Sequence, residues 1–358
     1  MVEGIETAHG SLDLEGLVKE KPIAACVISS TLTSTIPNIS LAGEISIATL
    51  FTPALDVEYV FHGKPMSIDI IPTTPSGIPT PALITRVALQ LSGIPFIAVD
   101  SGSYIEPRIP FIALPSRRVG GKINEEEALP RGTSRKLFLE AKSLGKVLGS
   151  LSRVVMVGES MPGGTTTALS ILRALGIGDY NSTSSSSNIN PVDMKKKVVE
   201  RALERARGVS DPFEINDIAG DPLHISVAGM AVGILSANSY AILAGGTQML
   251  AALALMKSSG ESFNEERVAI ATTRWVYEDR GEEMVKIVKR ISPGSSILYI
   301  NLNFSDSPFE GLRAFEKGFV KEGVGAGGAS MLAISRGVSM EGLKASIYKE
   351  YESLIERK

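Results

Sequence analysis

The stretch from Arg153 to Leu175, RVVMVGESMPGGTTTALSILRAL, constrains the fold more than any other part of the chain. Val154–Val157 is a short apolar run, typical of a strand that is buried on both faces of a parallel sheet. The turn Gly158–Thr166 is rich in Gly, Ser and Thr, and Thr165–Leu175 then carries apolar residues at helical spacing. We therefore expect a strand, a glycine-rich turn and a helix of the α/β class.

The same turn predicts a binding site for an anion. A glycine-rich turn that leads into a helix places free backbone N–H groups and a helix N-terminus at one point, which favours phosphate. The turn is not a Walker loop, because Gly164 stands where that loop has lysine, and it is not a G-x-G-x-x-G fingerprint. Glu159 places a carboxylate beside this predicted phosphate site, and the two negative groups would repel each other. A ligand that also carries an N–H, an O–H or a positive charge would offset that repulsion by contacting Glu159. The alternative is a tight connection whose glycines serve packing alone.

The order of apolar strand, polar turn and helix recurs along the chain. The further expected strands are Ile23–Ile28, Asp56–Phe61, Pro95–Val99, Tyr240–Leu243, Val268–Ala271 and Ser296–Asn303. The further expected helices are Pro81–Leu91, Thr133–Leu148, Val192–Arg207, Gln248–Met256, Glu282–Ile291, one opened by a Ser307/Glu310 capping box, and Ser339–Arg357. This alternation predicts an α/β fold with a doubly wound, mostly parallel sheet and helices on both faces. We expect a single domain over residues 1–358, in which the N-terminal part and residues 339–358 form a smaller accessory helical layer.

Most of the expected strands end in polar or glycine-rich turns. In a doubly wound sheet, ligands bind beyond the carboxyl ends of the strands, where such turns meet. The residues expected to border one cleft there are Glu159, Thr165, Gly246, Thr272, Ser305 and Glu322.

Two neighbouring polar segments lie between the expected strands. The composition of Asn181–Pro191, NSTSSSSNINP, is typical of a flexible excursion or linker. The helix after it carries Lys195, Lys196 and Lys197 near its start, where positive charge opposes the helix dipole. One interpretation of these lysines is a solvated charged face, and the other is that Lys195 is the counter-charge for a bound phosphate.

Composition excludes several classes of function. The chain has 36 basic residues against 39 acidic ones, so no electrostatic argument favours binding to nucleic acid or to a membrane surface. Cys26 is the single cysteine and the 3 histidines are scattered, so neither an internal disulfide nor a zinc site is expected. The N-terminal segment is acidic and has no apolar core of the kind that a secretory signal has. We expect a cytoplasmic protein that needs no cofactor.

Residues 222–256 contain no Lys, Arg, Asp or Glu. A membrane span needs about 20 predominantly apolar residues, but Asn238, Ser239 and the residues 245–248 divide this run into pieces of helix, strand and helix length. The run is therefore predicted as buried α/β core, with a membrane segment as the alternative. Its apolar content also favours a homodimer that covers what one subunit cannot bury.

Two segments together resemble nicotinate-nucleotide:dimethylbenzimidazole phosphoribosyltransferase, an enzyme family of cobalamin assembly. The family's turn reads roughly G-E-x-G-x-G-N-T-T before a helix, and Gly158–Thr166 stands in its place. The family's later G-E-G-x-G-A-A corresponds to Lys321–Gly327, and Lys195 is similar to the family's basic residue before a comparable helix. The N-terminal part resembles a divergent, archaeal-type branch, in which Pro72–Pro81 stands in place of the family's base-binding segment.

The resemblance implies a reaction and a set of partners. Phosphoribose would pass from nicotinate mononucleotide to a benzimidazole-like base, giving nicotinate and an α-riboside 5′-phosphate for the lower ligand of a cobamide. The resemblance places the general base at Glu322. The residues expected to contact substrate are Glu159, Met161, Gly163, Gly164, Thr165, Thr166, Lys195, Gly246, Ser305, Gly323 and Gly325.

Departures from the family's motifs leave alternatives open. Met161 stands at the family's second loop glycine, Gly164 at its asparagine, and Ala244 at an aspartate that relatives carry. These departures favour a nucleotide-binding protein of this fold without turnover. Pro72–Pro81, which stands in place of the family's base-binding segment, leaves the base open, so a further alternative is the same transfer to adenine or a phenolic base. The alternative for Glu322 is an exposed glutamate in a flexible turn, and Glu159 would then be the next candidate for the general base.

Overall fold

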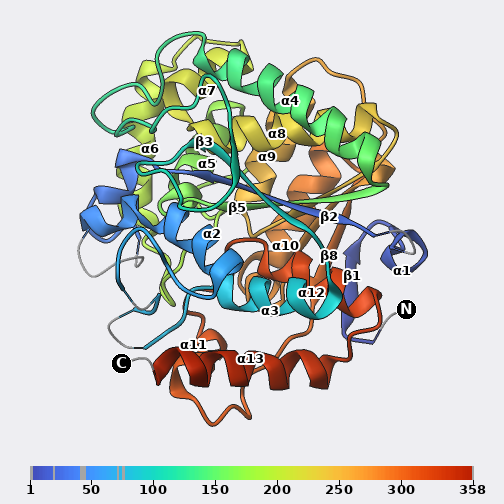
Figure 1. The fold of residues 1–358 in the computed structure, drawn as a ribbon. Helices are drawn as coiled ribbons and strands as arrows, with labels where there is room; N and C mark the ends of the chain where they lie inside the picture. The colour runs from blue at the N-terminus through green and yellow to red at the C-terminus, as the bar shows by residue number, and fades with distance from the viewer. Residues whose placement is uncertain (1–2, 19–20, 41–45, 71, 75–76, 357–358) are drawn as a thin grey trace.

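The computed structural model describes residues 3–18, 21–40, 46–70, 72–74 and 77–356 (Figure 1). The strands are β1 (Ile5–His9), β2 (Ile23–Ser29), β3 (Phe96–Gly102), β4 (Phe111–Ala113), β5 (Val154–Ser160), β6 (Tyr240–Ala244), β7 (Val268–Thr273) and β8 (Ser296–Ile300). The α-helices are α1 (Leu14–Leu17), α2 (Thr52–His62), α3 (Ala82–Ser92), α4 (Thr133–Leu151), α5 (Gly164–Ala174), α6 (Val192–Arg205), α7 (Pro212–Ala219), α8 (Pro222–Ser236), α9 (Gln248–Ser258), α10 (Arg274–Ile291), α11 (Glu310–Glu316), α12 (Ala326–Ser335) and α13 (Met340–Ile355). Short 3-10 helices are η1 (Leu32–Thr35), η2 (Ser46–Leu50) and η3 (Glu265–Arg267).

A single sheet joins the strands of the described residues in the order β1-β8-β7-β6-β5-β2-β3-β4. Neighbouring strands are parallel, except that β1 is antiparallel to β8. The chain proceeds from β2 to β3 and β4 on one side, and from β5 to β8 on the other. The strand order therefore reverses between β2 and β5, which is the place where doubly wound sheets bind ligands. The predicted doubly wound, mostly parallel sheet with helices on both faces is confirmed.

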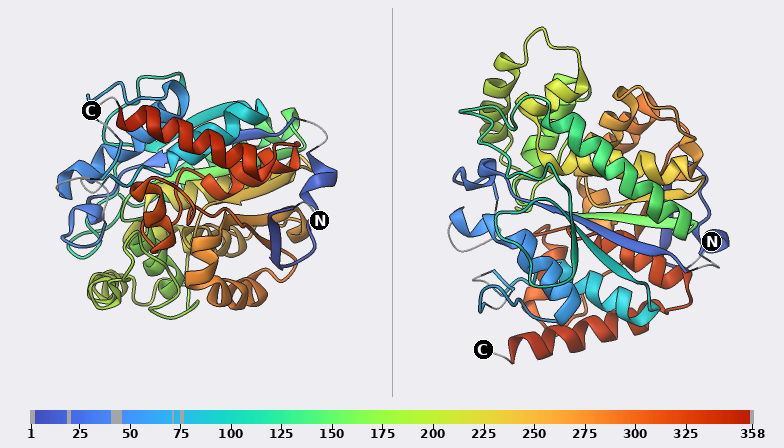
Figure 2. Two further views of the ribbon diagram at one scale, coloured as in Figure 1. Left: turned by 90° about the horizontal axis from the view of Figure 1, so that it is seen from below. Right: turned by 45° about the horizontal axis from the view of Figure 1, so that its top comes forward.

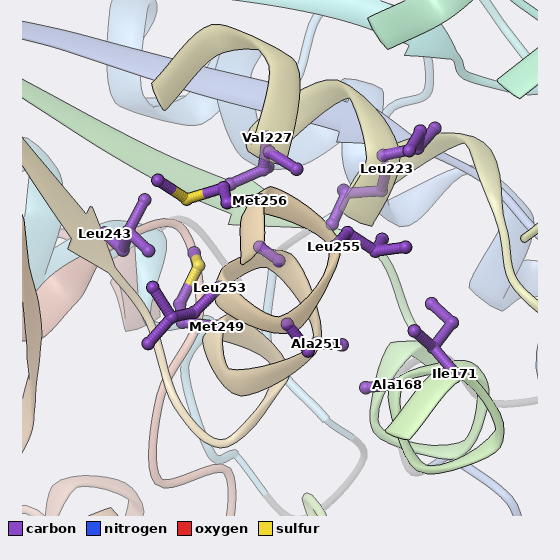
Figure 3. Close-up of a cluster of buried hydrophobic side chains, with 14 of the residues drawn as sticks. Ala168, Ile171, Leu223, Val227, Leu243, Met249, Ala251, Leu253, Leu255 and Met256 are labelled. Atoms are coloured by element: carbon purple, nitrogen blue, oxygen red, sulfur yellow. The ribbon is translucent and has the colours of Figure 1, made fainter. Parts of the chain in front are cut away.

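Alternate residues of the central strands point into two separate cores. On β2, Ala25 and Val27 enter the core formed with α4, α5, α8 and α9, whereas Ala24, Cys26 and Ile28 enter the core formed with α2, α3 and α12. Figure 3 shows part of the first core, where side chains of α5, α8, β6 and α9 meet. Because both faces are covered, the central strands read as continuous apolar runs in the sequence.

The uncharged run 222–256 forms α8, β6 and most of α9 and lies inside the molecule. Residues of α8 from Pro222 to Leu235 are buried, and so are those of α9 from Met249 to Met256. Its prediction as buried core is confirmed. Among the described residues, no helix is long and apolar enough to cross a membrane. Since one chain already hides this run, the run itself gives no ground for a dimer.

The segment Asp56–Phe61, which the sequence predicts as a strand, belongs instead to helix α2. Its acidic residues alternate with apolar ones, as in a half-exposed strand, yet Asp56 and Glu58 are both buried. Each carboxylate accepts hydrogen bonds from residues far along the chain, such as Ser160 for Asp56 and Arg108 for Glu58. Distant partners thus allow a helix that is buried on nearly every side.

Smaller differences concern the C-terminal elements and the outer layer. Helix α11 begins at Glu310 without a side-chain cap, because the Ser307 hydroxyl accepts instead from the Phe309 N–H. Helix α13 packs on α3, which packs on α2, so α13 lies outside these two helices (Figure 2). The N-terminal strands β2 and β3 nevertheless lie within the sheet, since their residues are buried on both faces. Arg357, the expected end of the last helix, lies outside the described residues.

Candidate functional site

The strand reversal brings the two glycine-rich turns of the sequence together. Glu159 is near the end of β5, paired with Val27 of β2. The Val324 N–H donates to the Glu159 carbonyl oxygen at 2.8 Å, so the second turn packs across the end of β5. We call residues 320–325 the Glu322 turn. Turns that are far apart in the sequence therefore share one place at the carboxyl edge of the sheet.

Glu322 is a half-buried carboxyl group at the start of helix α12. Its Oε1 accepts from the Gly323 N–H at 3.1 Å, and its carboxylate accepts from the Gly327 N–H at 3.2 Å. Burial raises the pKa of Glu322 to about 7, although these backbone donors favour the charged form. A carboxyl group whose pKa lies near neutral pH is well suited to general-base catalysis.

Glu159 is more deeply buried and lies beside Glu322. Burial raises the pKa of Glu159 well above its ordinary value, and the negative charges of Glu322 and Asp56 raise it further. Its Oε1 accepts a hydrogen bond from Gln248 Nε2 at 3.0 Å. At position 164 a Cβ atom would lie 1.8 Å from Gln248 Oε1, so glycine leaves the space that the amide occupies. The buried Gln248 Oε1 has no donor among the described residues.

Asp56 of α2 supplies a third acidic group to this place. Its oxygens accept from Thr80 Oγ1 at 2.6 Å and from Ser160 Oγ at 2.7 Å. Burial raises the pKa of Asp56 to about 6, against the opposing effect of the two hydroxyls. The Asp56 contact fixes Ser160, the residue after Glu159, and so holds the end of β5 in place.

Several helix N-termini meet around the two glutamates. Helix α5 begins at Gly164 against the first residue of α9, Gln248. Gly246, two residues before α9, is placed so that a Cβ there would lie 3.7 Å from the Cβ of Glu322. The start of α10 joins them, since Thr273 Oγ1 donates to the Lys321 carbonyl oxygen at 2.6 Å. The positive ends of helices favour negative charge, so this edge suits carboxylates and a phosphorylated ligand together.

The polar segment Asn181–Pro191, which the sequence predicts as flexible, is largely built into the molecule. Ser182, Thr183, Ser184 and Ser185 are buried. The Ser184 N–H donates to Thr247 Oγ1 at 2.9 Å, which attaches the segment to the N-terminus of α9. We call residues 182–187 the serine segment. Its polar composition misled the sequence prediction because the residues that pair with it lie far away in the chain.

Lys195 of α6 lies against the serine segment. Its ammonium is fully buried, and it donates to the Ser184 carbonyl oxygen and to Thr183 Oγ1. Burial lowers the pKa of Lys195 to about 7, and the positive charges of Arg280 and Lys321 lower it further. This buried position excludes the solvated charged face as the interpretation of Lys195, whereas its role as a counter-charge for phosphate stays a prediction.

The remaining predicted site residues on the first glycine-rich turn lie around Glu159 and the start of α5. Gly163 and Gly164 form the start of α5; Thr165 after them is partly exposed, and Thr166 is buried with no hydroxyl partner among the described residues. The Met161 side chain is buried in the core, and its N–H donates to the Glu159 carboxyl.

Other predicted residues are placed by their own turns. Gly323 and Gly325 belong to the Glu322 turn, and Thr272 is buried at the end of β7. Ser305 lies in the exposed turn before α11, where its hydroxyl donates to Asn303 Oδ1. Within the described residues, no cluster of His, Cys, Asp and Glu is arranged to hold a metal ion.

Sequence reasoning missed several members of the site. Asp56 was hidden by the strand prediction, and Gln248 by its place in an apolar helix. Lys321 carries no signal beyond its position next to Glu322. For each of these residues the partner lies far away along the chain, so no local spacing points to it.

Comparisons with known proteins agree with this architecture. No family model matches the chain. A UPF0284 protein of Aeropyrum pernix is 44% identical over 358 residues, 99% of each chain, and one of Archaeoglobus fulgidus is 41% identical over 351 residues, 98% of this chain and 99% of that one. Among solved structures, a nicotinate-nucleotide-dimethylbenzimidazole phosphoribosyltransferase from Thermus thermophilus is similar in fold, with a TM-score of 0.62 at 14% identity. The match covers 95% of this chain and 86% of that one. A structure of CobT from the same organism has a TM-score of 0.59 at 13% identity, with the same coverage.

Proposed function

We propose a reaction for this chain, which belongs to the UPF0284 protein family: it transfers phosphoribose from nicotinate mononucleotide to a benzimidazole-like base. The observation that carries the proposal is the meeting of Glu322 and Glu159 at the strand reversal, among helix N-termini that favour a phosphate. The fold supports it, since a solved structure that is similar in fold is named as a nicotinate-nucleotide-dimethylbenzimidazole phosphoribosyltransferase. The resemblance of both turns to the motifs of that family supports it as well.

The proposed transfer needs one base and no acid. The nitrogen of the incoming base attacks C1′ of the ribose while the bond from C1′ to the pyridinium nitrogen breaks. The electron pair of that bond neutralises the pyridinium, so nicotinate leaves without being protonated. The attacking ring loses its N–H proton to the Glu322 carboxylate, which ends the step as a carboxylic acid.

Glu159 and the phosphate site have separate roles in this proposal. The ribose carbon gains positive charge as the leaving bond breaks, so the buried carboxylate of Glu159 stabilises the transition state when it is ionised. Gln248 Nε2 favours that ionised form by donating to it. The 5′-phosphate is held by the N–H groups at the start of α5. Lys195 of α6, whose ammonium donates to the serine segment, is the cation assigned to this phosphate.

The product of this reaction would be an α-riboside 5′-phosphate for the lower ligand of a cobamide. Two alternatives remain open. The departures at Met161, Gly164 and Ala244 favour a chain that binds a nucleotide without turnover, and the segment Pro72–Pro81 leaves adenine or a phenolic base open as the acceptor. The choice of acceptor distinguishes the second alternative from the main proposal, and the absence of nicotinate release on every base distinguishes the first.

The experiment is a release assay. The purified protein is incubated with nicotinate mononucleotide and, one at a time, dimethylbenzimidazole, benzimidazole, adenine and a phenol, while free nicotinate is measured. Release that depends on a benzimidazole supports the proposal, and release with adenine or phenol alone supports the second acceptor class. Calorimetric binding of the nucleotide without release on any base would establish the binding protein and contradict the transferase.

A further inference from the structure

Lys321 adopts a backbone conformation that is unusual for its residue type. Its φ is 40°, and both Val320 and Val324 of the same turn also have positive φ, at 62° and 55°. Residues other than glycine rarely adopt this region, and β-branched ones least of all. Such strain persists only where the surroundings hold the backbone in place, and it gathers at functional sites.

The serine segment is what holds the strained turn. The Lys321 ammonium, which is almost fully buried, donates to the carbonyl oxygens of Ser185 and Ser187, each at 2.8 Å. The Val320 N–H donates to the Ser186 carbonyl oxygen at 2.8 Å. Backbone and side chain of the Glu322 turn are therefore both attached to one short segment.

The charges around Lys321 do not balance. Its ammonium faces Asp279 of α10 at 3.4 Å, and the same carboxylate pairs with Arg280 at 3.0 Å and accepts from Ser184 Oγ at 2.5 Å. Lys195 approaches the serine segment from α6. Lys321 and Arg280 thus share one carboxylate, whose negative charge also acts on Lys195. Burial lowers the pKa of both lysines. A buried excess of positive charge is relieved when an anion binds.

We propose that Lys321 binds the 5′-phosphate of the nucleotide together with Lys195, and that through its backbone it couples this phosphate to the position of Glu322. The inference rests on the proposed function and adds to it Lys321 as a phosphate-binding residue and a preference for phosphorylated nucleotides. Because Glu322 is the next residue, whatever fixes Lys321 also fixes the general base. The site would therefore select a phosphorylated nucleotide over the same nucleoside without phosphate.

Binding tests the first half of the inference and needs no turnover. Calorimetry compares nicotinate mononucleotide with nicotinate riboside on the wild-type protein and on Lys321→Met. The variant should bind the nucleotide about 10- to 100-fold more weakly, the effect of one hydrogen bond to a charged group, while riboside affinity stays within about twofold. Lys317→Met, at an ammonium-bearing side chain that is 61% exposed in the same region, is the matched control and should change neither affinity. Nucleotide affinity that Lys321→Met leaves within about twofold of wild type overturns the inference.

A double-variant cycle tests the coupling to Glu322. Lys321→Met should lower kcat by about 10²-fold at saturating nucleotide, because a misplaced base is a poor proton acceptor. In a Glu322→Gln background the same change should have almost no further effect, since Lys321 acts through Glu322. Two effects that multiply would show that Lys321 acts independently, and would contradict the coupling.

A second variant distinguishes loss of the Lys321 ammonium from misfolding of the strained turn. Lys321→Gly removes the ammonium, and glycine accepts the positive φ without strain. It should reproduce the loss of nucleotide affinity while the protein remains folded by circular dichroism. If the wild-type protein binds the nucleotide but none of the tested bases causes nicotinate release, the proposed transfer fails. The binding comparison still decides the role of Lys321 in that case. A wild-type protein that binds riboside as tightly as nucleotide overturns the inference directly.

Discussion

Glu322 has the two properties that a general base needs: an accessible carboxyl group and a pKa near neutral pH. Burial raises its pKa to about 7, while the N–H groups of Gly323 and Gly327 hold the carboxylate in one orientation. The N–H groups at the start of α12 orient the Glu322 carboxylate, and burial makes it basic. A substitution that keeps the size of the side chain but removes the carboxylate therefore separates the two effects.

Glu322→Gln keeps the size of the side chain but removes the proton acceptor. Turnover should fall by about 10²- to 10⁴-fold, while nucleotide affinity stays near that of wild type. In the wild type, the rate should fall about tenfold for each pH unit below the pKa of Glu322, because only the deprotonated form accepts a proton. Initial rates from pH 5 to pH 9 measure both effects (the range brackets a pKa of about 7).

The control for this variant is Glu310→Gln, at a glutamate side chain that is 79% exposed on α11. It should keep the wild-type rate and pH profile. Near-normal turnover in Glu322→Gln would exclude Glu322 as the base and transfer that role to Glu159.

Alanine at the neighbouring positions Gly163 and Gly164 should affect different properties, stability at the first and activity at the second. At Gly163, φ is 80° and a Cβ would lie 2.9 Å from the backbone of Ser34, so Gly163→Ala should destabilise the fold by about 1 kcal/mol or more. At Gly164 the atoms nearest to a Cβ all belong to the end of the Gln248 side chain, which can rotate away. Gly164→Ala should therefore keep the stability but break the hydrogen bond to Glu159 and slow turnover.

Chemical unfolding and initial rates distinguish these two variants. The activity loss of Gly164→Ala should largely disappear in a Gln248→Ala background, since the amide is then already absent. An equal loss of activity in both backgrounds would contradict the role assigned to Gln248.

At the scale of an element, helix α2 holds two loops in place through one buried carboxylate. Glu58 accepts from the N–H groups of Met66, Ser67 and Arg108 and from the Ser67 hydroxyl. Burial alone would raise the pKa of Glu58, but these donors together hold it below its ordinary value. The folded state therefore binds the proton less readily than the unfolded chain does.

Glu58→Gln should reduce the free energy of unfolding by about 1–3 kcal/mol at neutral pH, because buried donors lose their acceptor. The contribution of Glu58 is present above the ordinary pKa of 4.5 and is lost as the pH falls through its lowered value in the folded state. Wild type and variant should therefore approach each other in stability at acidic pH. Urea unfolding at several pH values measures this, with Glu352→Gln on the exposed side of α13 as control. A difference that stays constant down to the lowest pH would contradict it.

Elements with strong local patterns could be predicted from the sequence, and those fixed by distant partners could not. Val154–Val157 and the helix after it follow from apolar spacing alone. In contrast, the sequence pattern of α2 predicts a strand, because the donors that pair with its buried carboxylates, such as Ser160 and Arg108, lie outside any local window. The composition of the serine segment predicts flexibility, because Lys195 and Lys321, which donate to its carbonyl groups, belong to other parts of the chain.

At the scale of the whole molecule, the alternation of strands and helices predicted the topology and hence the meeting of Glu159 with Glu322. Parallel strands place their carboxyl ends at one edge, so residues that follow different strands converge without any local signal. The orientation of each side chain there depends on packing between elements. The involvement of Gln248 and Asp56 therefore emerged only from the three-dimensional structure.

Helix α4 carries an apolar stripe on its outer side that bears on the predicted homodimer. Leu139, Val147 and Leu151 are 52%, 55% and 71% exposed and recur at intervals of one or two helical turns, so they share a face. Exposed apolar residues that lie together on one face are typical of interaction surfaces. The buried run 222–256 no longer supports a dimer, but this stripe gives the prediction a definite location.

We therefore expect a homodimer in which the α4 stripes of two copies pack together. Sedimentation at micromolar concentration should show twice the mass of one chain, and Leu139→Glu combined with Val147→Glu should shift it to a single chain, because two carboxylates would have to be buried without partners. Leu91→Glu, at an exposed leucine near the end of α3, should leave the dimer intact. A wild-type protein that sediments as one chain contradicts the dimer. A dimer that the α4 variant leaves intact instead contradicts α4 as the contact surface and implies that another face of the molecule holds the two copies together.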